Sequence, residues 1–545
     1  MRAFRKMGRS GALGFLPKYR GNRLLHLFSC VFLVLLSYFF FASFLFPNSD
    51  IIQYHPMAYC LLAVVVAMGG WGVLRLGSRF ARLSARKRSL SVAALLCLLL
   101  PLQYVLFKSV YYQPGWDVSL LTEAGYWLAL EKGIPTNILE YFACYPNNVT
   151  LMMIWAYMTK FLIRFFGYYD YLLAAILLSA VLCDLALFFA FQTADRWLSP
   201  AKALFCLYLG IPLIAFAPWM VNPYSDTMSI LFPVFALYLL LRGRELQRRW
   251  LRAMLYFFAG GILCFGFMVK PTVIIVLVAL LIFGVFGTKH KVERLGFFKA
   301  LGIAVLGFAL VYFPMQQMRT QVMVRSGVTE AHIQEVKYPA THFLMMGMQK
   351  QPSPFMPERY QYGKWYARDC TTTYSEKGQQ AKMQANLTVI GARLREFGPG
   401  GYLRFLSDKG RWVLGDGTMY FGGEVPTDGC FQTGPLSTFL QKFFWKNGEF
   451  YTATAHLLQA FWLCTLGLCC LPLLHREDDY AAPLCAVSRL SVCGIILFVL
   501  LFEGRARYLI NYLPLFLVLA AYGTGVFSQH STPETELLQT AETDA

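Results

Sequence analysis

Long apolar segments, separated by shorter polar ones, recur along the whole chain. Each is about 15–22 residues long, which is the length that carries a helix across the hydrocarbon core of a bilayer. The clearest examples are residues 25–46, 171–192, 453–473 and 507–527. Counting all such segments predicts an all-α polytopic membrane protein, with a bundle of about 13 (12–14) transmembrane helices.

Basic residues cluster between these segments. Short loops rich in Lys and Arg mark the cytoplasmic side of a membrane protein. With the N-terminus inside, the count of crossings predicts that residues 111–148, 221–227 and 319–452 are extracytoplasmic. The basic clusters themselves occupy residues 2–23, 75–88, 242–252 and 289–299.

The same count predicts how the chain is organised. Two hydrophilic segments stand out, both on the outer side, and the second is long enough to form a lid. The predicted parts are a basic cytoplasmic tail (1–24), a transmembrane GT-C-like module (25–318) with a first external loop (111–148), an extracytoplasmic segment or lid (319–452), C-terminal transmembrane helices (453–527) and a cytoplasmic tail (528–545).

The apolar segment 202–220 does not fit the count as a single crossing. The chain must cross an even number of times between residues 148 and 221, yet three apolar segments lie there. If segment 202–220 is split in two at Gly210-Ile211-Pro212, the number of crossings becomes even, as the count requires. Broken helices at membrane depth line cavities or are buried by protein, although a plain proline kink explains the same residues.

Composition narrows the classes of function. Hydrophobic residues make up 57% of the chain and charged residues 14%, which is far too apolar for a soluble domain. The net charge of +19 follows the loop pattern above, whereas a nucleic-acid-binding protein would gather its Lys and Arg on one face. We therefore expect a membrane protein with no nucleic-acid partner. Cys144, Cys370 and Cys430 fall in predicted external loops, where a disulfide could form.

Acidic residues gather at the predicted outer face. Asp117 follows Pro-Gly-Trp just after a membrane exit, with Glu123 close behind it, and Asp226 lies in Tyr-Ser-Asp-Thr at the outer end of another segment. Each has an ordinary explanation as a solvated loop carboxylate or a helix N-cap. A carboxylate at such a position can instead act as a general base toward a hydroxyl group.

Three cations lie at the same predicted depth. Lys270 ends one apolar segment, and Arg505 and Arg507 begin the last one. Snorkelling explains Lys270, and an ion pair with Glu503 or another carboxylate explains the arginines. A lipid phosphate would also explain them, because guanidinium groups pair with phosphate oxygens through two hydrogen bonds. Carboxylates and cations at one interface suit the transfer of a sugar from a polyprenyl-phosphate carrier.

Several short motifs occur in a fixed order between about residues 90 and 527. They are the loop of Asp117, Tyr145-Pro146-Asn147-Asn148, Tyr224-Ser225-Asp226-Thr227, Lys270-Pro271-Thr272, residues 339–347 around His342, Gly415-Asp416-Gly417-Thr418 and Glu503-Gly504-Arg505-Ala506-Arg507-Tyr508. In these motifs the chain resembles the bacterial GT-C-type membrane glycosyltransferases related to protein O-mannosyltransferases and the lipid A aminoarabinose transferase.

The resemblance implies a function and roles for residues. It implies transfer of a monosaccharide from a polyprenyl-phosphate carrier to a cell-envelope glycan, lipid or protein acceptor, usually with inversion, on the outer side of the plasma membrane. Asp117 would be the catalytic base and Asp226 the second catalytic acidic residue. The substrate-binding residues would be Lys270, Arg505 and Arg507 at the carrier phosphate and His342 in the lid.

The chain departs from the family pattern at one informative position. Val118 follows Asp117, where eukaryotic-type mannosyltransferases carry an adjacent Asp-Glu pair, and this favours a glycan or lipid acceptor over a protein. Some relatives hold a divalent metal, so a divalent metal is possible here, but the sequence offers no ligand set strong enough to assert one. We therefore assign no metal site and no certain cofactor.

Two other functions fit a polytopic chain. A multi-pass transporter or flippase is one, because ionisable residues inside the membrane mark transport paths. A polymerase or ligase of lipid-linked glycans is the other, since it would use the same face and the same carrier. The long external segment and the polar motifs crowded at one face favour the interfacial enzyme.

Overall fold

Helices form almost all of the regular structure. The computed structural model describes residues 23–287, 291–425, 432–471 and 482–525. The helices of the first half are α2 (Arg23–Leu45), α3 (Pro56–Phe80), α4 (Ala85–Val110), α5 (Asp117–Ala129), α6 (Thr136–Cys144), α7 (Val149–Phe166), α8 (Tyr171–Trp197), α9 (Pro200–Gly210), α10 (Ser225–Met228), α11 (Leu231–Glu245) and α12 (Arg249–Val269).

The second half alternates between membrane helices and shorter external ones. One small antiparallel sheet joins β1 (Lys350–Pro352) to β2 (Tyr360–Tyr362). The helices are α13 (Ile275–Gly287), α14 (Lys291–Arg325), α15 (Glu330–Val336), α16 (Ala340–Gly347), α17 (Ala367–Tyr374), α18 (Gln379–Leu414), α19 (Pro435–Phe444), α20 (Tyr451–Cys470), α21 (Ala482–Leu501) and α22 (Leu513–Gly523).

The helix count agrees with the apolar pattern. In the described residues, 11 helices are long and apolar enough to cross a membrane, and two shorter apolar helices, Pro200–Ala215 and Pro271–Phe286, bring the total to 11 + 2 = 13. The prediction of an all-helical polytopic membrane protein is therefore confirmed.

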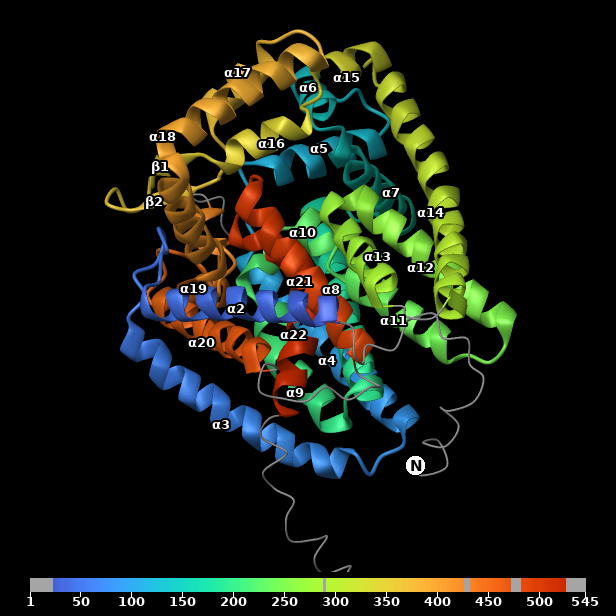
Figure 1. Ribbon diagram of the computed structural model, residues 1–545. Coiled ribbons are helices and arrows are strands. Elements are labelled where there is room, and N and C mark those ends of the chain that lie inside the picture. The colour runs from blue at the N-terminus through green and yellow to red at the C-terminus, as the bar shows by residue number, and fades with distance from the viewer. Residues whose placement is uncertain (1–22, 288–290, 426–431, 472–481, 526–545) are drawn as a thin grey trace, which may run out of the picture.

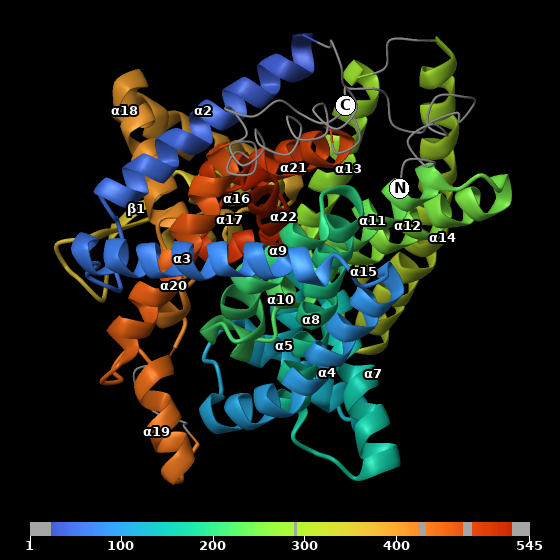
Figure 2. The same cartoon turned by 90° about the horizontal axis from the view of Figure 1, so that it is seen from below.

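Burial separates central helices from peripheral ones. In the span Ala506–Gly523, which contains α22, 94% of the residues are buried by protein, whereas the figure for α3 is 17%. Figure 2 shows α3 running along the outside of the bundle. α3 is apolar like the span of α22, but protein covers little of it. A bilayer would therefore cover its exposed apolar side chains.

The helix in segment 202–220 changes form at the predicted place but does not split there, because it continues to Ala215. α9 ends at Gly210, a π-helical turn follows at Ile211–Ala215, and a 3-10 turn spans Pro218–Val221 before α10 begins. Pro212 has no N–H to continue an α-helical ladder, which favours the change to a π-helical turn here. The irregular stretch leads directly to Asn222 and Asp226.

The last helix differs from its prediction in one respect. The apolar segment 507–527 begins as a 3-10 helix, Ala506–Tyr512, and becomes α-helical only at Leu513. The short α10 contacts this 3-10 helix. Two irregular stretches that are far apart in the sequence therefore meet inside the bundle.

The predicted external segment 319–452 contains several small helices. Its first residues continue α14 to Arg325, and its described residues beyond that include α15 to α19, the β1–β2 pair and the start of α20. α18 is kinked at Gly398, whose φ of +59° suits glycine. Figure 1 shows α15, α16 and α17 gathered with α5 and α6 at one end of the molecule.

Two of the three external-loop cysteines can be located. Cys144 and Cys370 are both free thiols, and burial raises the pKa of Cys370 to about 12. Cys430 lies outside the described residues. A disulfide between Cys144 and Cys370 is therefore not formed.

Thiol labelling can test the predicted topology. Cysteines introduced at the exposed positions Lys132 and Lys377 should react with a membrane-impermeant thiol reagent added to intact cells. A cysteine at Arg86, in a predicted cytoplasmic loop, should react only after the membrane is opened. Labelling of Lys132→Cys or Lys377→Cys only in opened cells would reverse the assigned sidedness.

Candidate functional site

A cavity of about 840 Å³ lies where the first external loop, the external segment and the start of the last helix meet. Aromatic rings form much of its wall, and its charged groups are few. The charged side chains that line it are Asp117, Lys270, Glu503, Arg505 and Arg507. Four of the six residues predicted for the site are therefore brought together at one cavity.

Asp226 lies behind the cavity and not on its wall. It lines a separate, water-sized chamber and is 2% exposed. Its carboxylate pairs with the Lys270 ammonium, and Arg507 Nη1 donates to its Oδ2 at 2.6 Å. A carboxylate that is paired with two cations is a poor base. Its two ion pairs instead hold Lys270 and Arg507 in place.

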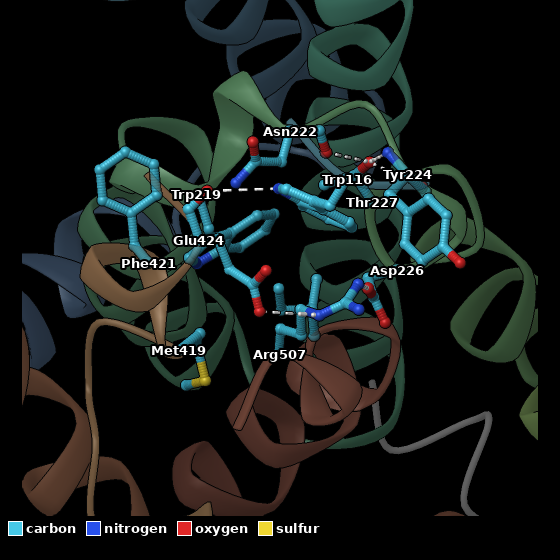
Figure 3. Close-up of a pocket in the computed structure, with 11 residues that line it drawn as sticks. Trp116, Trp219, Asn222, Tyr224, Asp226, Thr227, Met419, Phe421, Glu424 and Arg507 are labelled. Carbon is cyan, nitrogen blue, oxygen red and sulfur yellow. Dashed lines mark hydrogen bonds and ion pairs between the residues drawn. The ribbon is translucent and has the colours of Figure 1, made fainter. Parts of the chain in front are cut away.

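Glu424 completes the same ion-pair network, and no sequence reasoning singled it out. Arg505 Nη1 pairs with its Oε1, and Arg507 Nε lies 3.4 Å from the same oxygen. Figure 3 shows the Arg507 guanidinium between Glu424 and Asp226. Burial raises the pKa of Glu424, but the charges of Arg505 and Arg507 outweigh it and hold the pKa below its ordinary value.

The network carries one excess positive charge. Three cations, Lys270, Arg505 and Arg507, face two carboxylates, Asp226 and Glu424, so that 3 − 2 = 1. All three cations also line the cavity, whereas the two carboxylates do not. An anion in the cavity would therefore meet cations that the carboxylates have already oriented.

Aromatic rings restrict the cations further. The Arg507 guanidinium lies 4.7 Å from the centre of the Trp116 ring and 4.9 Å from that of Tyr224. The Lys270 ammonium lies 4.5 Å from the centre of the Tyr508 ring. These distances fit cation–π contacts, which restrict the movement of the Arg507 guanidinium and the Lys270 ammonium.

Asp117 has a different environment from Asp226. It is the first residue of α5, and it faces the cavity. Tyr224 donates its hydroxyl to Asp117 Oδ2 at 3.0 Å, and no ion pair holds Asp117 in the described part of the chain. Burial, followed by the charge of Asp117, raises the pKa of Tyr224, which keeps it a hydrogen-bond donor. The Tyr224 hydroxyl therefore orients the Asp117 carboxylate, and no cation neutralises its charge through an ion pair in the described residues.

Glu123 is separated from this cavity. Its Oε1 accepts a hydrogen bond from Trp127 Nε1 at 3.4 Å on the same helix, as their four-residue spacing predicts. It does not line the cavity. Of the two carboxylates that the sequence singled out in the first external loop, Asp117 and Glu123, the geometry favours Asp117 as the base.

His342 is buried behind the wall as well. Its Nδ1 lies 2.7 Å from Thr373 Oγ1, and its ring stacks on Tyr338 with centroids 4.2 Å apart. Its neighbours Ala340 and Phe343 line the cavity, but His342 does not. Burial lowers its pKa to about 4, so that it is neutral at physiological pH. Its contacts join α16 to α17.

The Gly415-Asp416-Gly417-Thr418 motif builds the turn that presents Glu424. Asp416 accepts hydrogen bonds from Tyr54, from the backbone N–H and hydroxyl of Thr418, and from the N–H of Tyr420. Met419 and Tyr420 adopt positive φ values within this turn. The motif therefore acts through local structure and places Glu424 beside Arg505.

A buried lysine holds the turn that carries Glu503 and Arg505. Lys409 donates to the carbonyl oxygens of Gly347 at 2.7 Å, Leu500 at 3.1 Å and Phe502 at 2.7 Å. Gly363 packs against it with a φ of +63°, and a Cβ there would lie 2.5 Å from Lys409 Nζ. The external segment thereby fixes the position of the cavity wall.

The residues present do not suit a divalent metal. The two buried carboxylates of the network are already engaged by Lys and Arg side chains. Within the ranges that the structure covers, no group of three or more His, Cys, Asp or Glu residues is placed to hold a metal ion. We therefore derive no step through a metal.

Comparisons with known proteins place the chain in a family. No curated protein sequence matches it. Among solved structures it is similar to ArnT from Cupriavidus metallidurans bound to undecaprenyl phosphate, with 13% sequence identity, a TM-score of 0.35, and coverage of 83% of this chain and 82% of that chain. The model of the family described as "Conserved hypothetical integral membrane protein" matches residues 20–526, and the chain belongs to that family.

Proposed function

We propose that this protein transfers a monosaccharide from a polyprenyl-phosphate carrier to an acceptor hydroxyl on the extracytoplasmic side of the plasma membrane. One observation carries the proposal. A single cavity is lined by Asp117, which has no cationic partner in the described ranges, and by three cations whose network has one excess positive charge.

The cations suit the phosphate of the carrier. A sugar–phosphate–prenyl diester has one negative charge, which equals the excess charge of the network. During transfer the bond between the sugar C1 and the phosphate oxygen breaks, and the oxygen keeps the electron pair. Lys270, Arg505 and Arg507 would stabilise the second charge that develops there, because they are oriented before the reaction begins.

Asp117 suits the other half of the reaction. The acceptor oxygen forms a bond to C1 as its proton passes to the Asp117 carboxylate. Tyr224 holds Oδ2 of this carboxylate and leaves Oδ1 for the acceptor. Attack opposite the leaving phosphate would invert the configuration at C1. General-base catalysis of this kind contributes about 10²–10⁴-fold to the rate.

The cavity also suits a sugar ring. Its wall includes Trp116, Tyr141, Tyr145 and Trp365, and flat aromatic faces pack against the apolar face of a pyranose while amides bind its hydroxyl groups. Asn147 and Asn148 supply such amides at the same wall. The acceptor would be a glycan or lipid of the cell envelope, or a protein. Val118, which replaces the second acidic residue of the mannosyltransferase pattern, favours the first two.

A transfer assay tests the function. Purified protein in liposomes is incubated with polyprenyl-phosphate monosaccharide that is labelled in the sugar, together with a cell-envelope extract as acceptor. We expect label to move from the carrier to the extract one sugar at a time. Turnover only with a diphosphate-linked oligosaccharide would indicate a polymerase or ligase. Movement of intact carrier between leaflets without transfer would indicate a flippase.

A further inference from the structure

Glu503 is a second carboxyl group on the cavity wall, and the mechanism above does not use it. It lies between the spans Pro483–Leu501 and Ala506–Gly523. The two arginines that follow it line the same cavity but form their ion pairs elsewhere: Arg505 pairs with Glu424, and Arg507 pairs with Asp226 and Glu424. Over the described residues no cation lies within ion-pair distance of Glu503. The sequence left open an ion pair of the arginines with Glu503 or with another carboxylate, and the second of these is formed.

The backbone fixes Glu503 toward the cavity. Its N–H donates to the Phe343 carbonyl at 2.7 Å, and the N–H of Gly504 donates to the Gly363 carbonyl at 3.0 Å. Lys409 binds the Phe502 carbonyl on the preceding residue. These hydrogen bonds hold the backbone of the turn in place, so the turn presents Glu503 at the cavity wall.

An anion beside Arg505 and Arg507 would lie close to this carboxyl group. An ionised Glu503 would repel it, whereas a protonated one would offer an O–H donor. Burial raises the pKa of Glu503, and the nearby charges of Arg505 and Arg507 reduce this shift without cancelling it. A bound phosphate would raise the pKa again.

We propose that Glu503 is an anion-binding residue of the cavity, which keeps its proton when the carrier phosphate is bound and donates a hydrogen bond from its carboxyl O–H to a phosphate oxygen. The proposal rests on the proposed function, because it takes the ligand to be a polyprenyl phosphodiester. No proton is transferred to the phosphate in this step. Binding of the carrier is instead linked to protonation of Glu503.

The sign of the pH dependence follows from this linkage. A group whose pKa is higher in the complex than in the free protein binds a proton as the ligand binds, so ligand affinity is full below both pKa values. Between them affinity falls by about tenfold for each pH unit, and above both it is constant again. Carrier affinity should therefore fall as pH rises.

Other titratable groups face Glu503 and must be told apart from it. Lys409 matters most, because burial lowers its pKa to about 7, in the range of the experiment. Arginine stays charged throughout this range. Several groups lie close enough to Glu503 for their charges to interact with its charge. They are Arg505, Arg507 and Tyr508 near the last helix, Asp117 on α5, Lys409 on α18, Tyr145 in the first external loop and Cys370 on α17.

Binding of a non-hydrolysable polyprenyl phosphodiester to the purified full chain tests the proposal. A phosphodiester does not titrate between about pH 5 and pH 9, so any change of affinity in that range belongs to the protein. The wild type should lose affinity by about tenfold per pH unit over part of the range. Glu503→Gln carries a neutral amide that donates but cannot ionise, so its affinity should not depend on pH. Glu358→Gln, on an exposed carboxylate, is the matched control and should keep the wild-type slope.

Each other outcome is decisive. A wild-type slope in Glu503→Gln would overturn the proposal and assign the titration to another group, with Lys409 the first candidate. A flat wild-type profile would also overturn the proposal. If Glu503→Gln does not fold, titration calorimetry of the wild type in buffers of different ionisation enthalpy measures the number of protons taken up when the phosphodiester binds. The proposal requires net proton uptake, and binding without uptake would overturn it. No binding by the wild type at any pH would overturn the proposed function itself, and this inference with it.

Discussion

Replacing Asp117 by Asn should lower the rate of sugar transfer by about 10²–10⁴-fold while carrier binding is retained. The amide has the shape of the carboxylate and can still accept the Tyr224 hydroxyl, which lies 3.0 Å from Oδ2. It cannot accept a proton from the acceptor. The loss should therefore appear in kcat, measured with labelled carrier at saturating acceptor, and the affinity for a phosphodiester analogue should change little.

Glu123→Gln is the matched control for this experiment. Glu123 is on the same helix and has the same chemistry, but it bonds to Trp127 and does not line the cavity. Its variant should transfer sugar at close to the wild-type rate. If Asp117→Asn instead turned over normally, the base would have to be another carboxylate, and Glu503 and Asp226 would be the remaining candidates near the cavity.

Replacing Arg507 by Ala should weaken carrier binding by about ten- to a hundredfold. Arg507 lines the cavity and also contacts both carboxylates of the network. Its loss removes a charge-assisted contact to phosphate, worth about 1.5–3 kcal/mol. It also cancels the excess positive charge of the network, because two carboxylates then face two cations. Arg507→Lys should restore only part of the affinity, since a point charge cannot reproduce the guanidinium fork.

Variants of the other two cavity cations, and of one arginine away from the cavity, test whether the effect on binding is specific to the cavity. Arg505→Ala and Lys270→Ala should also weaken binding of a polyprenyl phosphodiester, measured on purified protein whose fold is checked by its melting temperature. Arg393→Ala removes a comparable ion pair, to Asp369, away from the cavity. It should lower the melting temperature and leave the affinity unchanged. Full affinity in all three cavity variants would mean that these cations only stabilise the fold.

Much of the architecture could be predicted because it depends on local properties of the chain. A run of apolar residues long enough to cross a bilayer must be helical there, since no water is present to bind its backbone groups. The 13 apolar helices of the described residues follow from this rule. The length of the α-helix in the last span could not be predicted, because apolar composition does not distinguish the 3-10 turns at Ala506–Tyr512 from an α-helix.

The candidate site was only partly predictable for the same reason. Lys270, Arg505 and Arg507 drew attention as cations at the outer ends of apolar segments, and Asp117 as a carboxylate at a membrane exit. Glu424 had no comparable signal, because it lies in a long polar segment where acidic residues are common. Asp226 and His342 stood in recognisable motifs, yet both lie behind the cavity wall.

The sequence by itself determined the membrane helices, the irregular turn at Pro212 in one of them and four of the charged side chains at the cavity, because each depends on a residue and its near neighbours. Only the tertiary structure decided which charges are neutralised. Asp226 meets Lys270 across 44 positions of sequence and Arg507 across 281, and Glu424 meets Arg505 across 81. Coulombic attraction depends on distance in space and on burial, so the same pattern of charges could have left Asp226 as the free base and Asp117 as the paired one. The packing of the external segment against the last helix is what leaves Asp117 without a cation and sets Glu503 beside the arginines.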